Sequence, residues 1–292
     1  MERLEVIKAR IVSVGQLRDV VGAMRSLAAM RMQQAAEMLA GARRYAHVID
    51  QAVTQALSLE DEPAAPPRRE RKVGLIVFSA EHGFVGGYAE SLSQAAVAIP
   101  AAVTLVVGTK GALSLAEQGR RADWVLPMAS HAGGLAEVAR RVADQVAERL
   151  ADGGVTHVET VYGRVAEGTR WQVQHQALFP PALATAPDPG RDGRAPLHHL
   201  PAAQLLARVV EERLLAELML AATESLAAEN AARLMAMTAA GDNIERKLED
   251  LGSQERILRQ EQITEELLDV VNGAELLFAG AAVTPRSSAP PG

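Results

Sequence analysis

The chain has 292 residues, of which 48% are apolar and only 3% aromatic, and it contains no cysteine. The lack of cysteine excludes disulfides, zinc–thiolate sites and thiol nucleophiles, and it fits a reducing compartment. With 30 basic and 36 acidic residues the net charge is −6, so we expect no nucleic-acid partner. The charged first residues predict no signal peptide, and the longest apolar stretch, which contains Pro100, predicts no transmembrane helix.

The fourteen prolines divide the chain, because none lies before Pro63 and none lies between Pro201 and Pro285. A proline inside a helix costs about 3 kcal/mol, so these two long segments are free of helix breakers. In both, apolar residues recur in steps of three and four, which is typical of one helix face. The stripe expected in the first segment is Leu4, Ile7, Ile11, Val14, Leu17, Val21, Met24 and Leu27 or Ala28. The second has Ile244, Leu248, Leu251, Leu258, Ile263, Leu267, Val270, Ala274 and Leu277, and Glu255 also falls on it. We predict shaft helices over residues 1–59 and 202–278.

Between these helices the sequence changes to short apolar runs bounded by turn-forming residues. Residues 60–72 read as a proline-rich charged linker. Strands are expected over 73–78, 103–107, 155–162 and, at an edge, 171–178, with helices over roughly 87–97, 110–118 and 134–151. Alternation of strands and helices predicts a small Rossmann-like α/β domain over 73–180 with a mostly parallel sheet. Residues 181–201 are expected to be a loop and 279–292 a disordered tail.

The two long helices come from opposite ends of the chain with a domain inserted between them, so antiparallel pairing is the simple topology. Each helix alone would expose its stripe, at about 1.5–3 kcal/mol for each large apolar side chain. The predicted fold class is therefore α/β, with a long antiparallel coiled coil of the N- and C-terminal helices and an inserted small α/β domain.

Three short motifs are candidates for chemistry. The glycines of Gly83-x-x-Gly-Gly follow a strand, as in phosphate loops, but the spacing is neither Walker A nor GxGxxG and no Lys-Ser/Thr follows. A tight strand-to-helix turn is the better interpretation. Glu81-His82 has no third catalytic member, and His198-His199 has no further ligand at metal spacing. We therefore expect no catalytic residue, no cofactor and no metal site.

Two blocks of the sequence resemble the gamma subunit of F-type ATP synthases, the central rotor shaft. The C-terminal block is the more specific: it begins with Glu224-Ser-Leu-Ala-Ala-Glu-Asn-Ala-Ala-Arg-Leu-Met-Ala-Met237 and continues through Asp242-Asn243, Arg259-Gln260, Ile263-Thr-Glu-Glu-Leu267 and Val270-Val-Asn-Gly-Ala274. The N-terminal block comprises Ile7-Lys-Ala-Arg-Ile-Val-Ser-Val14, Ala23-Met24-Arg25 and Ala42-Arg-Arg-Tyr45. The glycine motif also matches, although Glu81-His82 and Val85 replace the usual residues of the family. These departures indicate a divergent branch, such as the rotor of an alternative F-type ATPase.

This resemblance implies a non-catalytic subunit that couples ion flow through a membrane ring to ATP synthesis or hydrolysis by rotation. The implied partners are a ring of alpha- and beta-type subunits, an epsilon-type subunit and a membrane c-type ring. The implied location is peripheral, at the cytoplasmic face of the inner (plasma) membrane. Carried over by motif position, the partner-contact residues are Met24 and Arg25 near the collar of the ring, Arg233, Gln260, Thr264 and Glu266 at its inner loops, and Leu267, Val270 and Val271 in its sleeve.

Two other classes of function stay open from the residues alone. A small-molecule-binding α/β domain with a coiled-coil assembly handle should show polar residues converging at the strand ends, where Ser79, Glu81 and Lys110 are the candidates. A static coiled-coil scaffold should show a strict hydrophobic heptad and self-association. Glu255 and several helix glycines fit that third class less well.

Overall fold

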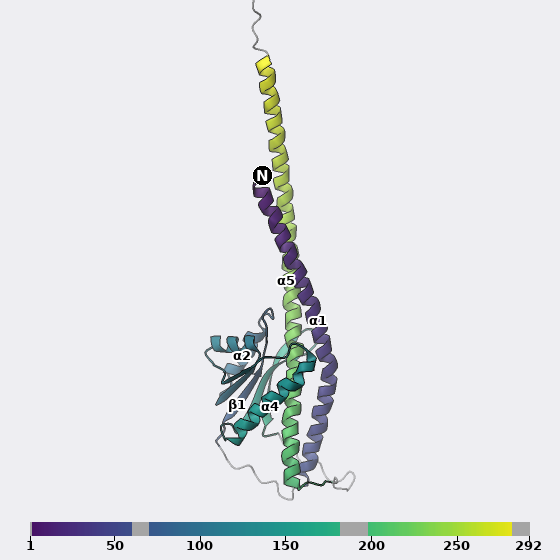
Figure 1. The fold of residues 1–292 in the computed structure, drawn as a ribbon, viewed down its shortest axis with the longest axis vertical. Helices are drawn as coiled ribbons and strands as arrows, with labels where there is room; N and C mark the ends of the chain where they lie inside the picture. The colour runs from purple at the N-terminus through teal and green to yellow at the C-terminus, as the bar shows by residue number, and fades with distance from the viewer. Residues whose placement is uncertain (1, 60–69, 182–197, 282–292) are drawn as a thin grey trace, which may run out of the picture. The chain divides into compact units, whose positions relative to one another are not determined.

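The computed structural model describes residues 2–59, 70–181 and 198–281, and the chain divides into two units. The helical-pair unit comprises Met1–Gly22 and Ala239–Gly292, and the α/β unit comprises Ala23–Thr238. Two long helices, α1 (Glu2–Leu57) and α5 (Ala202–Ala281), each contribute to both units (Figure 1). Helix α5 ends three residues later than expected, and the remainder of the expected tail, most of the linker and most of the loop lie outside the described residues.

The sheet of the α/β unit has the strand order β3-β2-β1-β4-β5. Strands β1 (Val73–Phe78), β2 (Val103–Val107), β3 (Trp124–Leu126) and β4 (His157–Val165) are parallel, and β5 (Trp171–Phe179) pairs with β4 antiparallel at the edge. The mostly parallel sheet was therefore predicted correctly. Strand β3 was missed because three residues are too few to produce a periodic pattern. Strand β4 starts two residues later than expected and continues to Val165.

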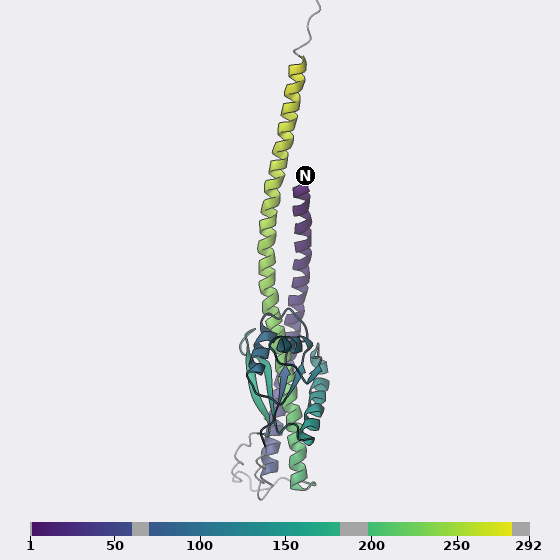
Figure 2. The same cartoon turned by 90° about the vertical axis from the view of Figure 1, so that its left-hand side faces the viewer.

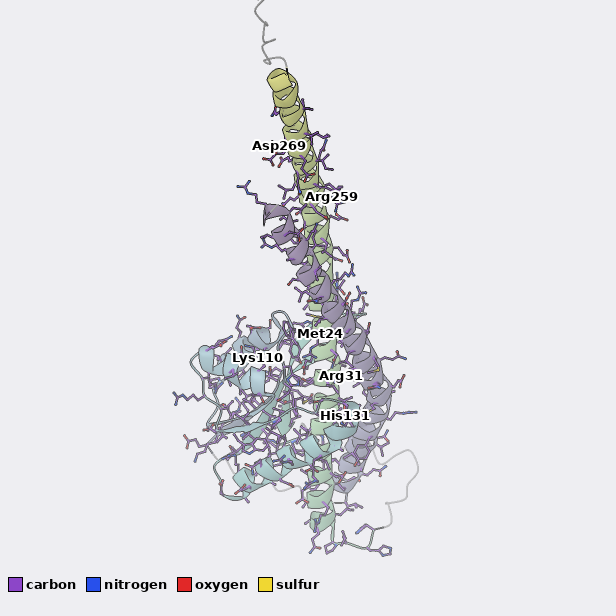
Figure 3. The ribbon with its side chains drawn as sticks, turned by 45° about the horizontal axis from the view of Figure 1, so that its top comes forward. Met24, Arg31, Lys110, His131, Arg259 and Asp269 are labelled. Atoms are coloured by element: carbon purple, nitrogen blue, oxygen red, sulfur yellow. The ribbon has the colours of Figure 1, made fainter. Side chains whose placement is uncertain are left out.

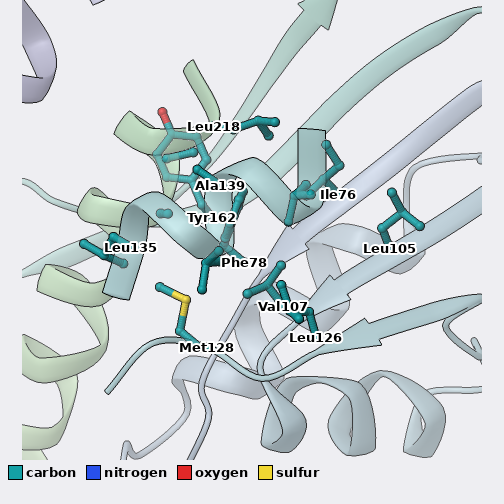
Figure 4. Close-up of a cluster of buried hydrophobic side chains, with 14 of the residues drawn as sticks. Ile76, Phe78, Leu105, Val107, Leu126, Met128, Leu135, Ala139, Tyr162 and Leu218 are labelled. Carbon is teal, nitrogen blue, oxygen red and sulfur yellow. The ribbon is translucent and has the colours of Figure 1, made fainter. Parts of the chain in front are cut away.

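Both faces of the sheet are covered, which explains why β1 is apolar at every position. Ile76 and Phe78 point to the face covered by α4 (Leu135–Ala151) and α5, where they pack with Leu105, Val107, Leu135 and Leu218 (Figure 4). Leu75 and Val77 point to the opposite face, which is covered by α2 (Tyr88–Val97) and α3 (Thr109–Glu117). A single turn of 3₁₀ helix, η1 (Ala132–Gly134), leads into α4.

Within the α/β unit, α1 and α5 lie side by side and antiparallel (Figures 1 and 2). Arg43 of α1 is 2.9 Å from Glu224 of α5, whereas Asp50, further along α1, is 2.6 Å from Arg213, which is earlier on α5. Because the residue numbers rise on one helix as they fall on the other, the pairing is antiparallel. The predicted fold class is confirmed.

The covered face of α1 follows a regular heptad of steps of three and four. Taking every seventh residue from Ile7 to Ala56, a series that includes Val21, Ala28 and Ala35, each one is buried or half-buried. Leu17, which was expected on this face, is 52% exposed, and its neighbour Arg18 is exposed as well, so neither side chain is covered at this turn of α1. Toward the C-terminal end of α1, Ala46, Val53 and Ala56 are also buried. The expected stripe is therefore correct except at Leu17. Of the two alternatives Leu27 and Ala28, Ala28 is the buried residue.

Candidate partner-contact surface

Helix α5 passes through three environments along its length. From Ala221 to Arg233 every residue is buried. From Met237 to Gln262 only one heptad face is covered, with Ile244 and Leu251 buried. From Ile263 to Asn272 every residue is exposed. Figure 1 shows why, since α5 continues beyond the start of α1. The prediction that Ile263, Leu267 and Val270 belong to the covered stripe of a helix pair is therefore wrong.

The exposed end of α5 carries five large apolar side chains, which we call the apolar tip: Ile263, Leu267, Leu268, Val270 and Val271. Their exposed fractions lie between 51% and 70%. Single exposed apolar residues are ordinary, but several on adjacent turns form a patch that commonly marks an interaction site. Three of these residues, Leu267, Val270 and Val271, were singled out from the sequence as sleeve contacts, and they are accessible.

The polar residues expected beside the tip are also at the surface. Gln260, Thr264 and Glu266 are all exposed. The Thr264 hydroxyl donates to the Gln260 carbonyl oxygen at 2.9 Å, and the side-chain amide of Gln262 donates to Glu266 Oε1 at 2.8 Å. Both bonds stay within α5, so these side chains can exchange them for bonds to a partner. Arg259 and Asp269 project from the same part of the helix (Figure 3).

The α1 candidates lie in the α/β unit. Met24 is half-buried and Arg25 is exposed, and the nearby Leu27 and Met30 are 42% and 49% exposed. Figure 3 shows Met24 and Arg31 on α1. Apolar and basic side chains therefore alternate over this part of the helix surface, as a contact with an acidic and apolar partner would require.

Arg233 does not belong to the accessible surface. Its side chain is only 9% exposed, and its Nη2 donates to Glu229 Oε1 at 2.6 Å. A second bond, of 3.3 Å, reaches the side-chain oxygen of Asn230. Burial raises the pKa of Glu229, and the Arg233 charge opposes that rise. A contact of Arg233 with a partner would leave Glu229 buried without its counter-ion, so we correct the expectation and assign Arg233 an internal role.

A polar network at the buried part of α5 joins α1 to the sheet. Glu224, which is 3% exposed, accepts a hydrogen bond from Arg43 of α1 and lies 3.5 Å from Arg164 of β4. About three helical turns earlier on α5, Arg213 donates to Asp50 of α1 and, at 3.1 Å, to the carbonyl oxygen of Leu178 in β5. Charged groups at this depth are stable only when they are paired, so α1, α5 and the sheet are held in one register.

Glu217 extends this network toward β5. It is 6% exposed and accepts a 2.9 Å bond from the Gln176 side-chain amide, whose oxygen accepts from Tyr162. Burial raises the pKa of Glu217, while the bond from Gln176 and the charge of Arg213 oppose that rise. Sequence reasoning missed these roles. The available signal was the set of polar residues within an alanine-rich helix, since alanines allow close packing and leave the polar groups buried among them.

Tyr88 ties the other face of the sheet to α5. It is completely buried, its hydroxyl is 2.9 Å from Ser225 Oγ, and its ring meets the Trp171 ring edge-on with the centroids 4.9 Å apart. Ser225 Oγ in turn donates to the Phe78 carbonyl oxygen at 3.2 Å. Burial raises the pKa of the Tyr88 hydroxyl well above its ordinary value, so it acts as a neutral hydrogen-bonding group.

The Glu81 carboxylate is a structural clamp. It accepts hydrogen bonds from the Thr109 amide and hydroxyl at 3.0 and 2.8 Å and from the Met128 amide at 2.8 Å. Burial raises the pKa of Glu81, but these three bonds outweigh burial and leave the pKa below its usual value. The carboxylate therefore joins the loop after β1 to the start of α3 and to the segment after β3.

In a nucleotide-binding α/β domain the ligand binds at the C-terminal ends of the strands. Here that space is filled by closely packed backbone and side-chain atoms. A Cβ added at Gly111 would lie 2.3 Å from Ser79 Cβ, and one at Gly108 would lie 2.5 Å from the Ser79 carbonyl oxygen. The glycine motif forms a turn in which Gly86 and Phe84 have positive φ. Ser79 and Glu81 thus serve the packing of the domain, which favours the turn interpretation over a phosphate loop.

Within the residues that the structure describes, no helix is both long and apolar enough to cross a membrane. In the same residues, no three histidine, aspartate or glutamate side chains come together as a metal ion would need.

Comparison with known proteins gives a consistent result over almost the whole chain. A family model described as ATP synthase matches residues 3–277. The ATP synthase gamma chain of Heliobacterium modesticaldum is 30% identical over 301 residues, covering 95% of this chain and all of that protein. The gamma chain of Frankia casuarinae is 29% identical over 300 residues, covering 95% of this chain and 99% of the relative.

Solved structures show the same fold at lower identity. A chain of the Euglena gracilis mitochondrial ATP synthase, from a structure of its OSCP/F1/c-ring, aligns over 99% of both chains with a TM-score of 0.64 and 14% identity. One from the central stalk and c-ring of the Tetrahymena thermophila enzyme aligns over 76% of this chain and 99% of that chain, with a TM-score of 0.55 and 20% identity.

A long helix pair that carries a five-stranded α/β unit defines the class of rotary ATPase central-stalk subunits. The chain belongs to the ATP synthase gamma chain family. The prediction of a non-catalytic rotor subunit of the F1 sector, peripheral to the membrane and not itself an enzyme, is confirmed. The small-molecule-binding domain and the static scaffold are set aside as its primary function.

Proposed function

We propose that this chain turns inside its catalytic ring with the apolar tip as a bearing, at the cytoplasmic face of the inner membrane. The observation that carries the proposal is the exposed stretch from Ile263 to Asn272, which no segment of the described chain covers. Removing its large side chains from water is favourable by about 1.5–3 kcal/mol each. Apolar contacts are weakly directional, so a sleeve of apolar residues would hold the tip without fixing one angle.

Polar contacts have the opposite role in this proposal. A hydrogen bond depends on direction, so each polar residue of the shaft would be satisfied at some angles of rotation and not at others. Gln260, Thr264 and Glu266 are exposed and keep their bonds within α5. A rotor acts on its ring only through contacts that differ between angular states, and we assign that difference to these residues together with Met24 and Arg25.

Rotation is useful only if the α/β unit turns with the shaft. The pairs Arg43–Glu224 and Arg213–Asp50, together with the Tyr88–Ser225 bond, connect both faces of the sheet and α1 to one buried stretch of α5. We propose that the α/β unit binds the epsilon-type subunit and the membrane c-type ring, and that this network transmits torque from them to α5.

The test replaces Leu267, Val270 and Val271 together with Asp in the purified complex. Three carboxylates would enter an apolar sleeve unpaired, at several kcal/mol each, so assembly should fall by more than tenfold. The control for added charge places Asp at three exposed apolar residues of the α/β unit, Val97, Leu113 and Val125; these lie outside the apolar tip and should leave the stoichiometry of the alpha- and beta-type ring subunits unchanged. Subunit stoichiometry and ATPase rate are measured for both. Normal assembly and turnover of the tip variant would refute the bearing.

A further inference from the structure

A cavity of about 560 Å³ lies in the α/β unit between α1, α4 and α5. Its wall is almost wholly apolar and includes Met38 and Ala42 of α1, Ala139 of α4, and Leu215 and Met219 of α5. The volume is within the 300–1,000 Å³ typical of small-molecule sites. The lining residues include none of those expected to contact the ring.

The polar atoms near the cavity are already engaged with other groups. The Tyr45 hydroxyl donates to Glu212, which raises its pKa to about 12. The Arg140 guanidinium donates to Glu137 and Asp144. A charged ligand would therefore lose water without gaining a counter-ion, whereas a hydrocarbon surface would lose nothing on entering.

Gly41 supplies part of the space. A glycine inside a helix costs up to about 1 kcal/mol relative to alanine, and such a glycine commonly permits close approach of another segment. At Gly41 a Cβ would meet no atom within 4 Å, so no segment of the described chain requires this glycine. Its effect is to enlarge the cavity. Met38 and Met219 line the same space with flexible thioethers that adapt to the shape of a ligand.

A second, more polar hollow adjoins the cavity, because Met38 lines both. The hollow, of about 570 Å³, is bordered by Gln34 and Glu37 of α1 and by His131 beside η1. Figure 3 shows His131 on the α/β unit near α1. A ligand longer than the apolar cavity would therefore reach hydrogen-bonding side chains at one end only.

We propose that this cavity binds a small, uncharged, largely hydrocarbon molecule whose one hydrogen-bonding end points toward His131. Such a ligand would contact α1, α4 and α5 at once, and so stabilise the folded α/β unit in proportion to its free concentration. The site is a property of the isolated chain and does not depend on the rotor function.

The probe for the test is N-phenyl-1-naphthylamine, a neutral dye that fluoresces in apolar surroundings, titrated into the purified full chain. Gly41→Leu fills the cavity, and its better helix propensity keeps the helix intact, so the dissociation constant should rise at least tenfold. The matched control is Gly15→Leu in the same helix, where an added Cβ also meets nothing and which does not line this cavity; its affinity should equal that of the wild type.

A second measurement locates the bound probe. In spectra of methionine methyl groups, the signals of Met38 and Met219 should shift with the same dissociation constant, and the signal of Met235, an exposed methionine on α5, should not. Equal probe affinity in the wild type and Gly41→Leu would overturn the proposal. So would saturation without movement of the Met38 and Met219 signals.

Discussion

Replacing Gly163 with Ala tests whether Tyr88 is the fixed joint between the sheet and α5. Gly163 is in β4, directly beneath the Tyr88 ring. An added Cβ would lie 2.5 Å from Cε2 and 2.6 Å from the hydroxyl oxygen of Tyr88, whereas carbon atoms in contact are ordinarily about 3.5–4.0 Å apart. The ring would have to move by about 1 Å, and it is held by Ser225 on one side and Trp171 on the other.

The size of the effect follows from these contacts. Overpacking of a well-packed site costs about 1–3 kcal/mol, and a strained bond from Tyr88 to Ser225 adds about 1 kcal/mol. Alanine in place of a strand glycine returns about 0.5–1 kcal/mol. The free energy of unfolding should therefore fall by about 2 kcal/mol, which urea titration followed by tryptophan fluorescence can measure, since Trp171 adjoins the site.

A double-mutant cycle separates this steric effect from a general loss of stability. In a Tyr88→Leu background the ring is gone, so adding Gly163→Ala should cost much less than it does in the wild type. If the alanine costs the same in both backgrounds, the contact with Tyr88 is not its cause and the reasoning is refuted.

Three further predictions concern carboxylates that are paired or hydrogen-bonded within the α/β unit. Arg43→Ala should lower the free energy of unfolding by about 1–3 kcal/mol, because Glu224 keeps only the more distant Arg164; Arg44→Ala, which removes an exposed arginine of the same helix, should change it by less than about 0.5 kcal/mol. Because burial raises the pKa of Glu217, its contribution to stability is present below the unfolded carboxyl pKa and is lost as the pH rises through the folded value. The wild type should thus lose stability relative to Glu217→Gln as the pH rises above the ordinary carboxyl range, and a constant difference in urea titrations would contradict this. Glu81→Ala should lower the free energy of unfolding by about 1–3 kcal/mol through three lost bonds, and an unchanged melting temperature would contradict the clamp.

The sequence was sufficient to predict elements whose signal is local. Proline spacing located both long helices, and the apolar runs at Val73–Phe78 and Val103–Val107 matched the strands residue for residue. The stripe of α1 failed at Leu17, which fits the helical period of 3.6 but is exposed. A periodic position is buried only where a partner segment covers that turn of the helix, and the register of the partner is not visible in a single segment.

The roles of the site residues were harder to predict because they depend on which residues meet across the fold. Arg233 and Gln260 look alike in sequence, as polar residues within the same resembling block. In the structure Arg233 is buried, whereas Gln260 is exposed. The network around Glu224 likewise joins residues separated by 60 to 181 positions, through Arg164 and Arg43, and no periodic pattern records such a distance.

The composition of α5 follows the three environments through which it passes. Where both the sheet and α1 press on it, alanines allow close approach, and the few polar residues are paired so that each fixes one orientation. Where one face is covered, a heptad of large apolar residues is sufficient and charges occupy the rest. Beyond the start of α1, the helix carries leucine and valine side chains that are exposed to water in the isolated chain. A soluble helix end gains nothing from such residues by itself, whereas the proposed bearing needs contacts that hold the shaft without fixing one angle. On this proposal, directional bonds fix α5 where it carries the α/β unit, and the apolar tip adds weakly directional contacts beside the polar residues Thr264 and Glu266, which distinguish the angular states.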